Sequence, residues 1–406
     1  MYQCQFCESA KVEEILFLGF LPPVNVMPHQ SDPATISENF SLPLCFCTNC
    51  KLTQIGTRLD KTLVFPRAYP YLSGVTQSLV ENFTSQAISV NEFLGLKKSD
   101  LVIDIGSNDG SLLKQYQSMS NVLGIEPTVA AEVAVSNGVP TINEFFTKTV
   151  ASKIIDNYGR ARVITACNVF AHIDGLDELM SSIKCLMLED GIFVSESHYL
   201  LSLIGTLQFD TIYHEHLRYY TVTFLESLFN EYDLEIFNVE SIDSHGGSIR
   251  VWACNKGIFK TRGSVDEFKK RELELEVLEL NGLRKFAKDV QIWRQEFRKL
   301  VSTLRLEGAV ISGIGAPSRA STLLTFAGLT EFDVENVAEV NNSAKIGRFI
   351  PGTRIPVLQE EDVLAQNPSH LLILSWHLKN SIISKLKNHG YKGKFIVPLP
   401  RPEVIE

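Results

Sequence analysis

The stretch that decides the fold is LVIDIGSNDGSLL, residues Leu101–Leu113. An apolar strand carries Asp104 at its end, the chain turns through Gly106 and Gly110, and a helix is expected to begin near Ser111. Glycines allow a tight turn and a close approach of the backbone to a ligand, and the first amides of a helix favour a negatively charged group. The segment therefore predicts a ligand-binding turn between a strand and a helix.

The glycine pattern distinguishes between possible ligands of this turn. A nicotinamide dinucleotide normally requires G-x-G-x-x-G, but the residue two places after Gly106 is Asn108. S-adenosylmethionine has no pyrophosphate and presents a ribose and a zwitterionic methionine tail. Glu126 ends the next expected strand, where its carboxylate can accept hydrogen bonds from ribose hydroxyls. The pattern favours S-adenosylmethionine over NAD, and over a turn that binds nothing.

Two later segments supply further candidate contacts at the same sheet edge. Phe145 and Phe146 follow the third expected strand, where an aromatic ring could stack on adenine, although each alone is more typical of a core residue. Asn168 and His172 follow the fourth strand. Ligands of parallel sheets bind at the carboxyl ends of the strands, so we expect these side chains near the cofactor.

The rest of the chain extends this pattern into an α/β protein of several parts. Short apolar strands alternate with amphipathic stretches, which is typical of βαβ units, and FNVESID and GGSIRVWACN read as an antiparallel edge of the same sheet. The stretch 265–300 is charged and helical in period, and a second α/β pattern follows it. The predicted fold is a class I methyltransferase Rossmann-like domain with a small N-terminal zinc-binding module and a second, C-terminal Rossmann-like α/β domain. The predicted boundaries are 1–68 for the zinc-binding module, 69–258 for the methyltransferase domain, 259–305 for connecting helices and 306–406 for the C-terminal domain.

Composition and charge limit the possible partners and location. The 406 residues are 45% hydrophobic and carry a net charge of −9, and no stretch concentrates Lys and Arg, so a nucleic acid partner is not expected. The first twenty residues lack the pattern of a signal peptide, and no apolar run is long enough to span a bilayer. We therefore expect a cytoplasmic protein without a membrane partner, either a monomer or a weak homodimer.

Four cysteines form two pairs at metal-binding spacing. Cys4 and Cys7 form one C-x-x-C pair, and Cys47 and Cys50 form the other. Thiols stay reduced in the cytoplasm, and a tetrahedral zinc takes four thiolates about 2.3 Å away. Cys45 competes with Cys47 for a place, but only Cys47 has the paired spacing. Four protein ligands leave no open position, so the predicted Zn²⁺ is structural.

The segment TIYHEHLRYYT, residues 211–221, gathers titratable side chains after the fifth expected strand. H-E-H is not the H-E-x-x-H of helical zinc sites. A histidine can remove a proton near neutral pH when a carboxylate or a phenol orients it. We expect His216 to be functional, with Tyr213 and Glu215 beside it, whereas His214 is as well explained by a polar surface turn.

These motifs together resemble the sugar C-methyltransferases that act on nucleotide-linked 4-keto-deoxy sugars. The resemblance covers essentially the whole chain and rests on CxxC…CxxC, YPYLSG, DIGSNDGSLL, NVFAHI, FDTIYHEHLRYY, HGGSIR, GIGAPSRASTLL and PGTRIPV. It implies a base that removes the proton from C3, which the C4 ketone acidifies, so that C3 then takes the methyl group. His216 is our candidate base, with Tyr213 and Glu215 orienting it or stabilising the enolate, and with His172 and Tyr71 lining the pocket.

The resemblance also implies that the C-terminal domain helps to hold the nucleotide sugar. Five polar side chains are candidates for binding it, the charged ones through its diphosphate: Arg250, Ser318, Arg319, Lys345 and Arg348. Three alternative functions explain less of the sequence than this hypothesis does. An O- or N-methyltransferase of a small metabolite leaves the second α/β domain unexplained, an inactive scaffold would not need the intact motifs, and an NAD-dependent epimerase lacks a third glycine in GIGAPS.

Overall fold

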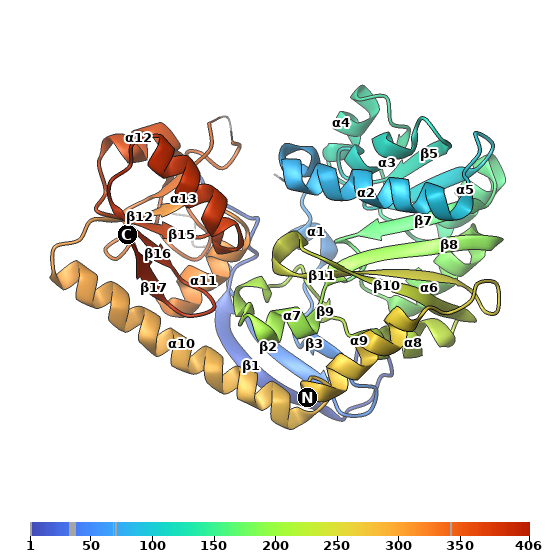
Figure 1. The fold of residues 1–406 in the computed structure, drawn as a ribbon, viewed down its shortest axis with the longest axis horizontal. Coiled ribbons are helices and arrows are strands. Elements are labelled where there is room, and N and C mark those ends of the chain that lie inside the picture. Colours follow the sequence, from blue (N-terminus) through green and yellow to red (C-terminus); the bar gives the residue numbers. More distant parts are fainter. Residues whose placement is uncertain (1, 32–37, 68, 70, 342) are drawn as a thin grey trace.

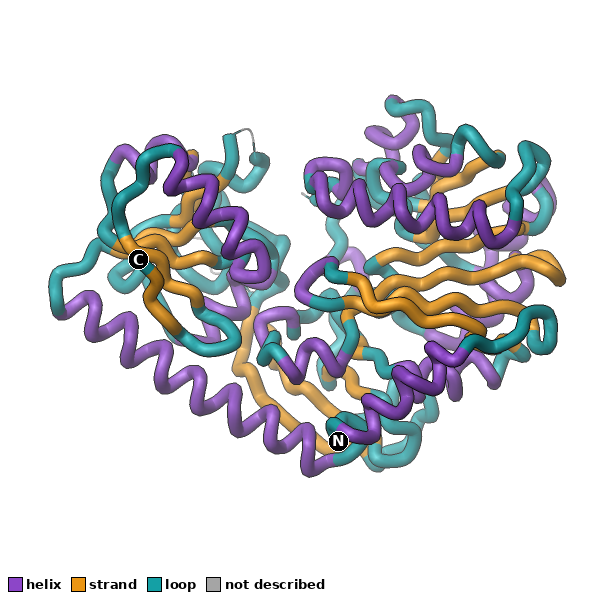
Figure 2. Tube along the Cα trace, in the orientation of Figure 1, coloured by secondary structure: helices purple, strands orange, loops and turns teal. Residues whose placement is uncertain are grey.

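A computed structural model describes residues 2–31, 38–67, 69, 71–341 and 343–406 of the chain. It contains three sheets, and a long helix, α10, runs from the central region to the C-terminal sheet (Figures 1 and 2). Among the described helices, none combines the length and the apolar character needed to cross a bilayer.

The N-terminal sheet is antiparallel and has the strand order β1-β2-β3-β9. Its strands are β1 (Val12–Leu21), β2 (Phe40–Cys47), β3 (Thr53–Ile55) and β9 (Arg218–Tyr219), and the helix α1 (Lys61–Val64) follows it. β9 comes from far along the chain, so the segment with the histidines completes this sheet. β1 has ten residues, and its apolar side chains join a core shared with the C-terminal domain.

The central sheet confirms the predicted α/β pattern. Its strand order is β10-β11-β8-β7-β4-β5-β6, and β11 runs antiparallel to the other strands. The strands are β4 (Leu101–Ile105), β5 (Asn121–Ile125), β6 (Thr141–Ile142), β7 (Ala161–Cys167), β8 (Met187–His198), β10 (Leu234–Ile242) and β11 (Ser248–Asn255). The predicted antiparallel edge is the β10–β11 pair.

Helices cover both faces of the central sheet, which is why strand β4 is buried throughout. Helices α2 and α3 pack on one face, and α5, α6 and α8 pack on the other. The α-helices and 3-10 helices (η) of this region are η1 (Ser73–Val75), α2 (Gln77–Leu94), α3 (Ser111–Tyr116), α4 (Ala130–Ser136), α5 (Lys148–Tyr158), α6 (Leu176–Leu186), α7 (Leu200–Gly205), η2 (Phe209–Thr211), α8 (Val222–Asn230) and η3 (Ser244–Gly246).

Two helices, α9 (Gly263–Glu274) and α10 (Leu280–Leu306), occupy the stretch for which we predicted helices. The apolar stripe of α10 is buried at spacings of three and four residues, through Leu283, Phe286, Val290, Trp293, Phe297 and Val301. The indole of Trp293 donates to the Pro398 carbonyl over 2.6 Å. The N-terminal sheet and the C-terminal domain share one core with α10, so they are held together by the same apolar contacts.

The C-terminal domain has a second mostly parallel sheet of order β14-β13-β12-β15-β16-β17, in which β17 is antiparallel. Its strands are β12 (Ile311–Ile314), β13 (Val337–Glu339), β14 (Val357–Gln359), β15 (His370–Ile373), β16 (Lys394–Val397) and β17 (Glu403–Ile405). Its helices are α11 (Arg319–Ala327), α12 (Glu360–Ala365), η4 (Trp376–Leu378) and α13 (Lys379–Asn388). The GIGAPS motif runs from the end of β12 to the start of α11.

Candidate active site

The turn after β4 has a backbone that few residues can adopt. Gly106, Asn108 and Gly110 have φ angles of 70°, 50° and 78°, in the left-handed region that favours glycine and tolerates asparagine. A Cβ atom on Gly106 would lie 2.3 Å from Cγ2 of Val169, so only glycine fits there without a shift. Gly110 immediately precedes α3, which begins at Ser111 as expected.

The carboxylate of Glu126 holds this turn in place. It accepts a hydrogen bond from the Asn108 amide over 3.1 Å and another from the Thr128 amide over 2.9 Å. Its Oε1 also accepts from the Thr128 hydroxyl over 2.6 Å, whereas Oε2 keeps a second lone pair to which a ribose hydroxyl can donate. Asp104 lies behind the turn and accepts from the Thr165 hydroxyl, and burial raises its pKa to about 7.

A segment ahead of α2 covers the turn, and sequence reasoning had assigned only Tyr71 from it. The side-chain amide of Asn108 donates through its nitrogen to the Tyr71 carbonyl over 3.1 Å. Its oxygen accepts from the backbone amide of Ser73 over 2.8 Å. The Gly74 amide donates to Asp109 over 2.8 Å. Tyr71 therefore lies between the cofactor turn and the histidine segment, where its charge interaction contributes to the raised pKa of Tyr213. The motif YLSG was the available signal.

The two phenylalanines predicted near adenine have other neighbours. The ammonium of Lys61 lies 4.4 Å from the ring centroid of Phe145, and Phe146 packs against the core of the central sheet. Asn168 has a φ of 57°, and its backbone amide donates to the Glu196 carbonyl near the end of β8 over 2.7 Å. Asn143, which the prediction did not single out, donates to the carbonyls of Glu126 and Thr128 and so fixes the strand end.

His216 lies in a cluster of aromatic and imidazole rings. Its ring centroid is 4.0 Å from that of Tyr213 and 4.9 Å from that of His172, so the structure brings these three predicted residues together. His198, at the end of β8, lies 4.8 Å away edge-on, and His245 lies 5.6 Å beyond it. Sequence reasoning missed these last two histidines, although the motif HGGSIR, which contains His245, had been recognised.

The tautomer of His216 follows from its one backbone contact. Its Nδ1 donates to the Thr211 carbonyl over 2.7 Å, and because a carbonyl only accepts, Nδ1 must carry the proton. Burial lowers the pKa of His216 well below its usual value, and the neighbouring His172 and Arg319 lower it further. The imidazole is therefore neutral at pH 7, and its Nε2 lone pair is available as a base.

Glu215 points to different partners from those we expected. Its carboxylate accepts from the Asn25 amide over 2.7 Å and from the Tyr69 hydroxyl over 2.8 Å. Burial raises its pKa to about 7, although both hydrogen bonds act in the opposite direction. The Thr211 carbonyl, and not Glu215, holds the ring of His216. Asn25 and Tyr69 are functional candidates that sequence reasoning missed.

The C-terminal domain reaches this site through the start of α11. The Ser318 hydroxyl donates a hydrogen bond to the side-chain oxygen of Asn25 over 2.8 Å. Arg319 donates to the His245 carbonyl over 3.0 Å, lies 3.8 Å from the buried carboxylate of Asp210, and stacks its guanidinium over Trp376. Two of the five residues predicted to bind the nucleotide sugar therefore border the histidine cluster.

Lys345 and Arg348 lie near the same loop. The Lys345 ammonium donates to the Ala316 carbonyl over 2.7 Å, and Arg348 donates to the Met27 carbonyl over 3.0 Å. Burial lowers the pKa of Lys345. A small cavity between the N-terminal module and the C-terminal domain is lined by Asn25, Met27, Ala316, Ser318 and Lys345, among others.

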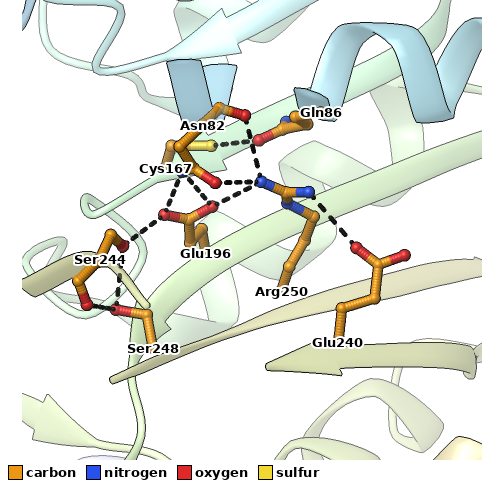
Figure 3. A network of polar contacts seen from close by, with 8 residues as sticks. All are labelled: Asn82, Gln86, Cys167, Glu196, Glu240, Ser244, Ser248 and Arg250. Atoms are coloured by element: carbon orange, nitrogen blue, oxygen red, sulfur yellow. Dashed lines mark hydrogen bonds and ion pairs between the residues drawn. The ribbon is translucent and has the colours of Figure 1, made fainter. Parts of the chain in front are cut away.

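Arg250 is placed away from the other four. It lies buried on β11, directly opposite Glu196 on β8 and Glu240 on β10, and pairs with these carboxylates over 3.1 and 3.3 Å (Figure 3). It also donates to Asn82 on α2 over 2.7 Å. Its terminal nitrogens are thus engaged inside the protein, and the register of the two strand pairs explains why.

The four paired cysteines meet at one point. The sulfur atoms of Cys4, Cys7, Cys47 and Cys50 all lie within 4.8 Å of one another. Two of the separations are 3.4 and 3.6 Å, close to the spacing of about 3.8 Å that four thiolates take around a tetrahedral zinc. The donor set fits a structural Zn²⁺, and Cys45 lies outside it.

Comparisons with known proteins agree with this arrangement. The family model described as "Methyltransferase domain" matches residues 82–239, and "C-methyltransferase C-terminal domain" matches residues 243–400. The C-methyltransferase NovU of Streptomyces niveus is 31% identical over 99% of this chain and 96% of its own length. An S-adenosylmethionine-dependent methyltransferase from Clostridium acetobutylicum, 14% identical, covers 44% of this chain and 92% of its own, with a TM-score of 0.35.

The central sheet, the cofactor turn and the matched models define an S-adenosylmethionine-dependent methyltransferase. The similarity to NovU extends over nearly the full length of both proteins. The chain therefore belongs to the C-methyltransferase family.

Proposed function

We propose that this enzyme methylates C3 of a nucleotide-linked 4-keto-6-deoxy sugar through an enolate, in branched-sugar biosynthesis. The observation that carries the proposal is the fixed tautomer of His216, whose Nδ1–H is held by the Thr211 carbonyl. A neutral imidazole with Nε2 free is the form that a general base needs. A carbon next to a ketone is acidic enough for such a base to deprotonate, whereas an isolated C–H bond is not.

The reaction balances as follows. The C3–H bond breaks, its proton moves to Nε2 of His216, and the electron pair forms an enolate with its negative charge on the C4 oxygen. The Gly106–Gly110 turn and Glu126 would hold S-adenosylmethionine, whose sulfonium would supply the methyl group. The enolate electron pair would form the C3–CH3 bond as the S–CH3 bond breaks, so that the C4 ketone re-forms and neutral S-adenosylhomocysteine leaves. The imidazolium then returns its proton to solvent.

Neighbouring side chains can stabilise the negative charge on the enolate oxygen and the positive charge on the imidazolium of His216. Burial raises the pKa of Tyr213 well above its usual value, so its phenol keeps its proton and can donate to the enolate oxygen. Glu215, when ionised, places a negative charge in the same buried region as the imidazolium, where electrostatic interactions are strong. His172, stacked on His216, lines the site and is our second choice for the base.

We propose that the nucleotide diphosphate binds against the loops that line the small cavity beside Asn25. Lys345 lines it, Ser318 offers a hydroxyl, and Arg319 and Arg348 flank the loop. Ser318 and Arg319 follow β12, and Lys345 and Arg348 follow β13, so these groups lie after the carboxyl ends of two neighbouring parallel strands, a position at which such sheets bind ligands. For the N-terminal module we propose a structural Zn²⁺ on Cys4, Cys7, Cys47 and Cys50, which leaves no coordination position open for catalysis.

The test is incubation with S-adenosylmethionine and a panel of nucleotide-linked 4-keto-6-deoxy sugars, followed by mass spectrometry. We expect a mass gain of one methylene with one substrate class, and exchange of the C3 hydrogen for deuterium when S-adenosylhomocysteine replaces the methyl donor. No product and no exchange with any of these sugars would refute the proposed substrate.

The role of His216 is tested with a matched pair of variants. His216→Asn should lower kcat about 10²- to 10⁴-fold, the usual contribution of a general base, while S-adenosylhomocysteine affinity stays near wild type. His214→Asn is the control, because that ring lies on the same segment but faces the Ser41 carbonyl and Phe40. If His216→Asn keeps its turnover, the base is another residue, and the same measurement on His172→Asn follows.

A further inference from the structure

Asn25 connects three parts of the chain beside the carboxylate of Glu215. It lies in the PPVN loop after β1, and only 6% of its surface is exposed. Its amide nitrogen contacts Glu215 in the histidine segment, and its amide oxygen contacts Ser318 at the start of α11. A residue of the zinc-binding module therefore stands between the candidate active site and the C-terminal domain.

The contacts of Asn25 form a closed ring around Glu215. Its amide nitrogen donates to Oε1 of Glu215 over 2.7 Å and to the Tyr69 oxygen over 3.1 Å. The Tyr69 hydroxyl donates in turn to Oε2 of Glu215 over 2.8 Å. Both carboxylate oxygens thus receive a donor, an arrangement that favours the ionised carboxylate over the protonated acid.

The orientation of the Asn25 amide is fixed by what its partners can do. An ionised carboxylate only accepts, so the NH₂ end must face Glu215. The amide oxygen then faces Ser318, whose hydroxyl donates to it over 2.8 Å. Without that hydroxyl the amide oxygen would lose its partner in a buried place, and the amide would be held less firmly.

We propose that Asn25 is a positioning residue that favours the ionised form of Glu215 near neutral pH, and that Ser318 holds Asn25 in the orientation that does so. The proposal rests on the catalytic role given to the Glu215 region above. It makes the ionisation of one buried carboxylate depend on the docking of the N-terminal module and the C-terminal domain against the central one.

Other ionisable groups near Glu215 act on it from several elements. Tyr69 precedes η1 and Tyr213 lies on the segment of Glu215 itself, and both interact with its charge. Tyr71, Arg319 and Asp210 act on Tyr213. Lys345 lines the cavity on the side of Ser318. Among these contacts, Asn25 and Tyr69 supply the hydrogen bonds that lower the pKa of Glu215, against the larger effect of burial.

The experiment measures the ionisation of Glu215 directly, without substrate. Infrared difference titration of the zinc-loaded enzyme follows the stretch of protonated carboxyl groups with pH, and Glu215→Gln identifies the band. In Asn25→Ala we expect the midpoint of the Glu215 band to rise by about 1 to 2 pH units, from the loss of one hydrogen bond to a charged group. Ser318→Ala should shift it in the same direction but less.

A matched control separates this effect from general loosening of α11. Thr325→Val changes another side chain of α11, whose hydroxyl has no partner among the described residues. It should leave the Glu215 midpoint unchanged. Circular dichroism and zinc content check that each variant is folded, and Ser318→Ala serves as the test if Asn25→Ala does not fold. An unchanged midpoint in a folded Asn25→Ala, or in a folded Ser318→Ala if that variant must serve alone, would overturn the proposal.

The C3 exchange reaction gives an independent readout. Its rate should rise with pH as Glu215 ionises, and Asn25→Ala should move that rise to higher pH by the same amount as the infrared midpoint. A merely structural role would lower the exchange rate equally at every pH and leave the position of the rise unchanged. If no keto sugar exchanges but the infrared midpoint shifts, the proposed substrate fails while the role of Asn25 stands.

Discussion

Gly106→Ala tests whether the cofactor turn packs as the structure shows. The added Cβ would lie 2.3 Å from Cγ2 of Val169 and 3.0 Å from two further carbons of that side chain, against a normal carbon contact of about 3.5 to 4.0 Å. Overpacking of this kind costs about 1 to 3 kcal/mol. The φ of 70° adds about 1 to 2 kcal/mol for a residue with a Cβ. We expect Gly106→Ala to lower the free energy of unfolding by about 2 to 5 kcal/mol and to weaken S-adenosylhomocysteine binding.

The two contributions can be separated with further variants. Gly138→Ala is the control, because Gly138 also has a positive φ, 80°, but its added Cβ would meet nothing within 4 Å. It should cost only the conformational part. Val169→Ala combined with Gly106→Ala removes the atoms that clash and should recover the overpacking part. Urea unfolding measures the stability of each, and calorimetry measures the affinity for S-adenosylhomocysteine. If Gly106→Ala costs no more than Gly138→Ala, or if Val169→Ala recovers nothing, Val169 does not pack against the turn.

Three other predictions follow from buried charges and from the cysteines. The folded-state pKa of Glu215 is about 7 and its ordinary value is 4.5, so the native protein holds an extra proton between these pH values and loses stability as the pH rises through them. In Glu215→Gln this loss should be smaller by about 3 kcal/mol in urea unfolding between pH 4 and pH 8, and an unchanged pH dependence would contradict the assignment. Arg250→Met should cost about 3 to 5 kcal/mol because it leaves Glu196 buried without its cation, whereas Glu240→Gln, at the more exposed partner, should cost about 1 kcal/mol or less. A strong chelator should release one zinc per chain, detected with a metal-sensitive dye, and lower the thermal midpoint, and a midpoint that does not move would argue against a structural metal.

Local features were the ones that could be predicted from the sequence. The turn after β4 is one, because the residues that form it are adjacent in the chain and glycine has a direct effect on backbone conformation. The paired cysteines are another, since C-x-x-C spacing places two thiolates at one metal whatever lies between the pairs. Each of these predictions needed only short-range geometry.

Long-range polar contacts could not be predicted in the same way. Asn25 and Glu215 are 190 residues apart, and nothing in a turn-forming PPVN segment indicates that its amide reaches a carboxylate. For Arg250, by contrast, the sequence predicted a ligand contact, but the side chain is engaged inside the protein. A cation beside a glycine turn resembles a phosphate contact, but the register of β11 with β8 and β10 places it between two carboxylates. Strand order and register decide such contacts, and one sequence does not specify them.

The three parts of the chain depend on one another because the N-terminal module and the C-terminal domain share a core along α10, while Asn25 accepts from Ser318 and donates to Glu215. Asn25 follows β1 by four residues, and β1 pairs with β2, which ends at Cys47. A metal at the cysteines would therefore hold the strand pair that carries the PPVN loop. Among the described residues, no hydrogen bond joins the four cysteines to the candidate active site. Zinc release should nevertheless affect catalysis, because it should loosen the positioning of Asn25. The Glu215 infrared midpoint should then rise before the central sheet unfolds.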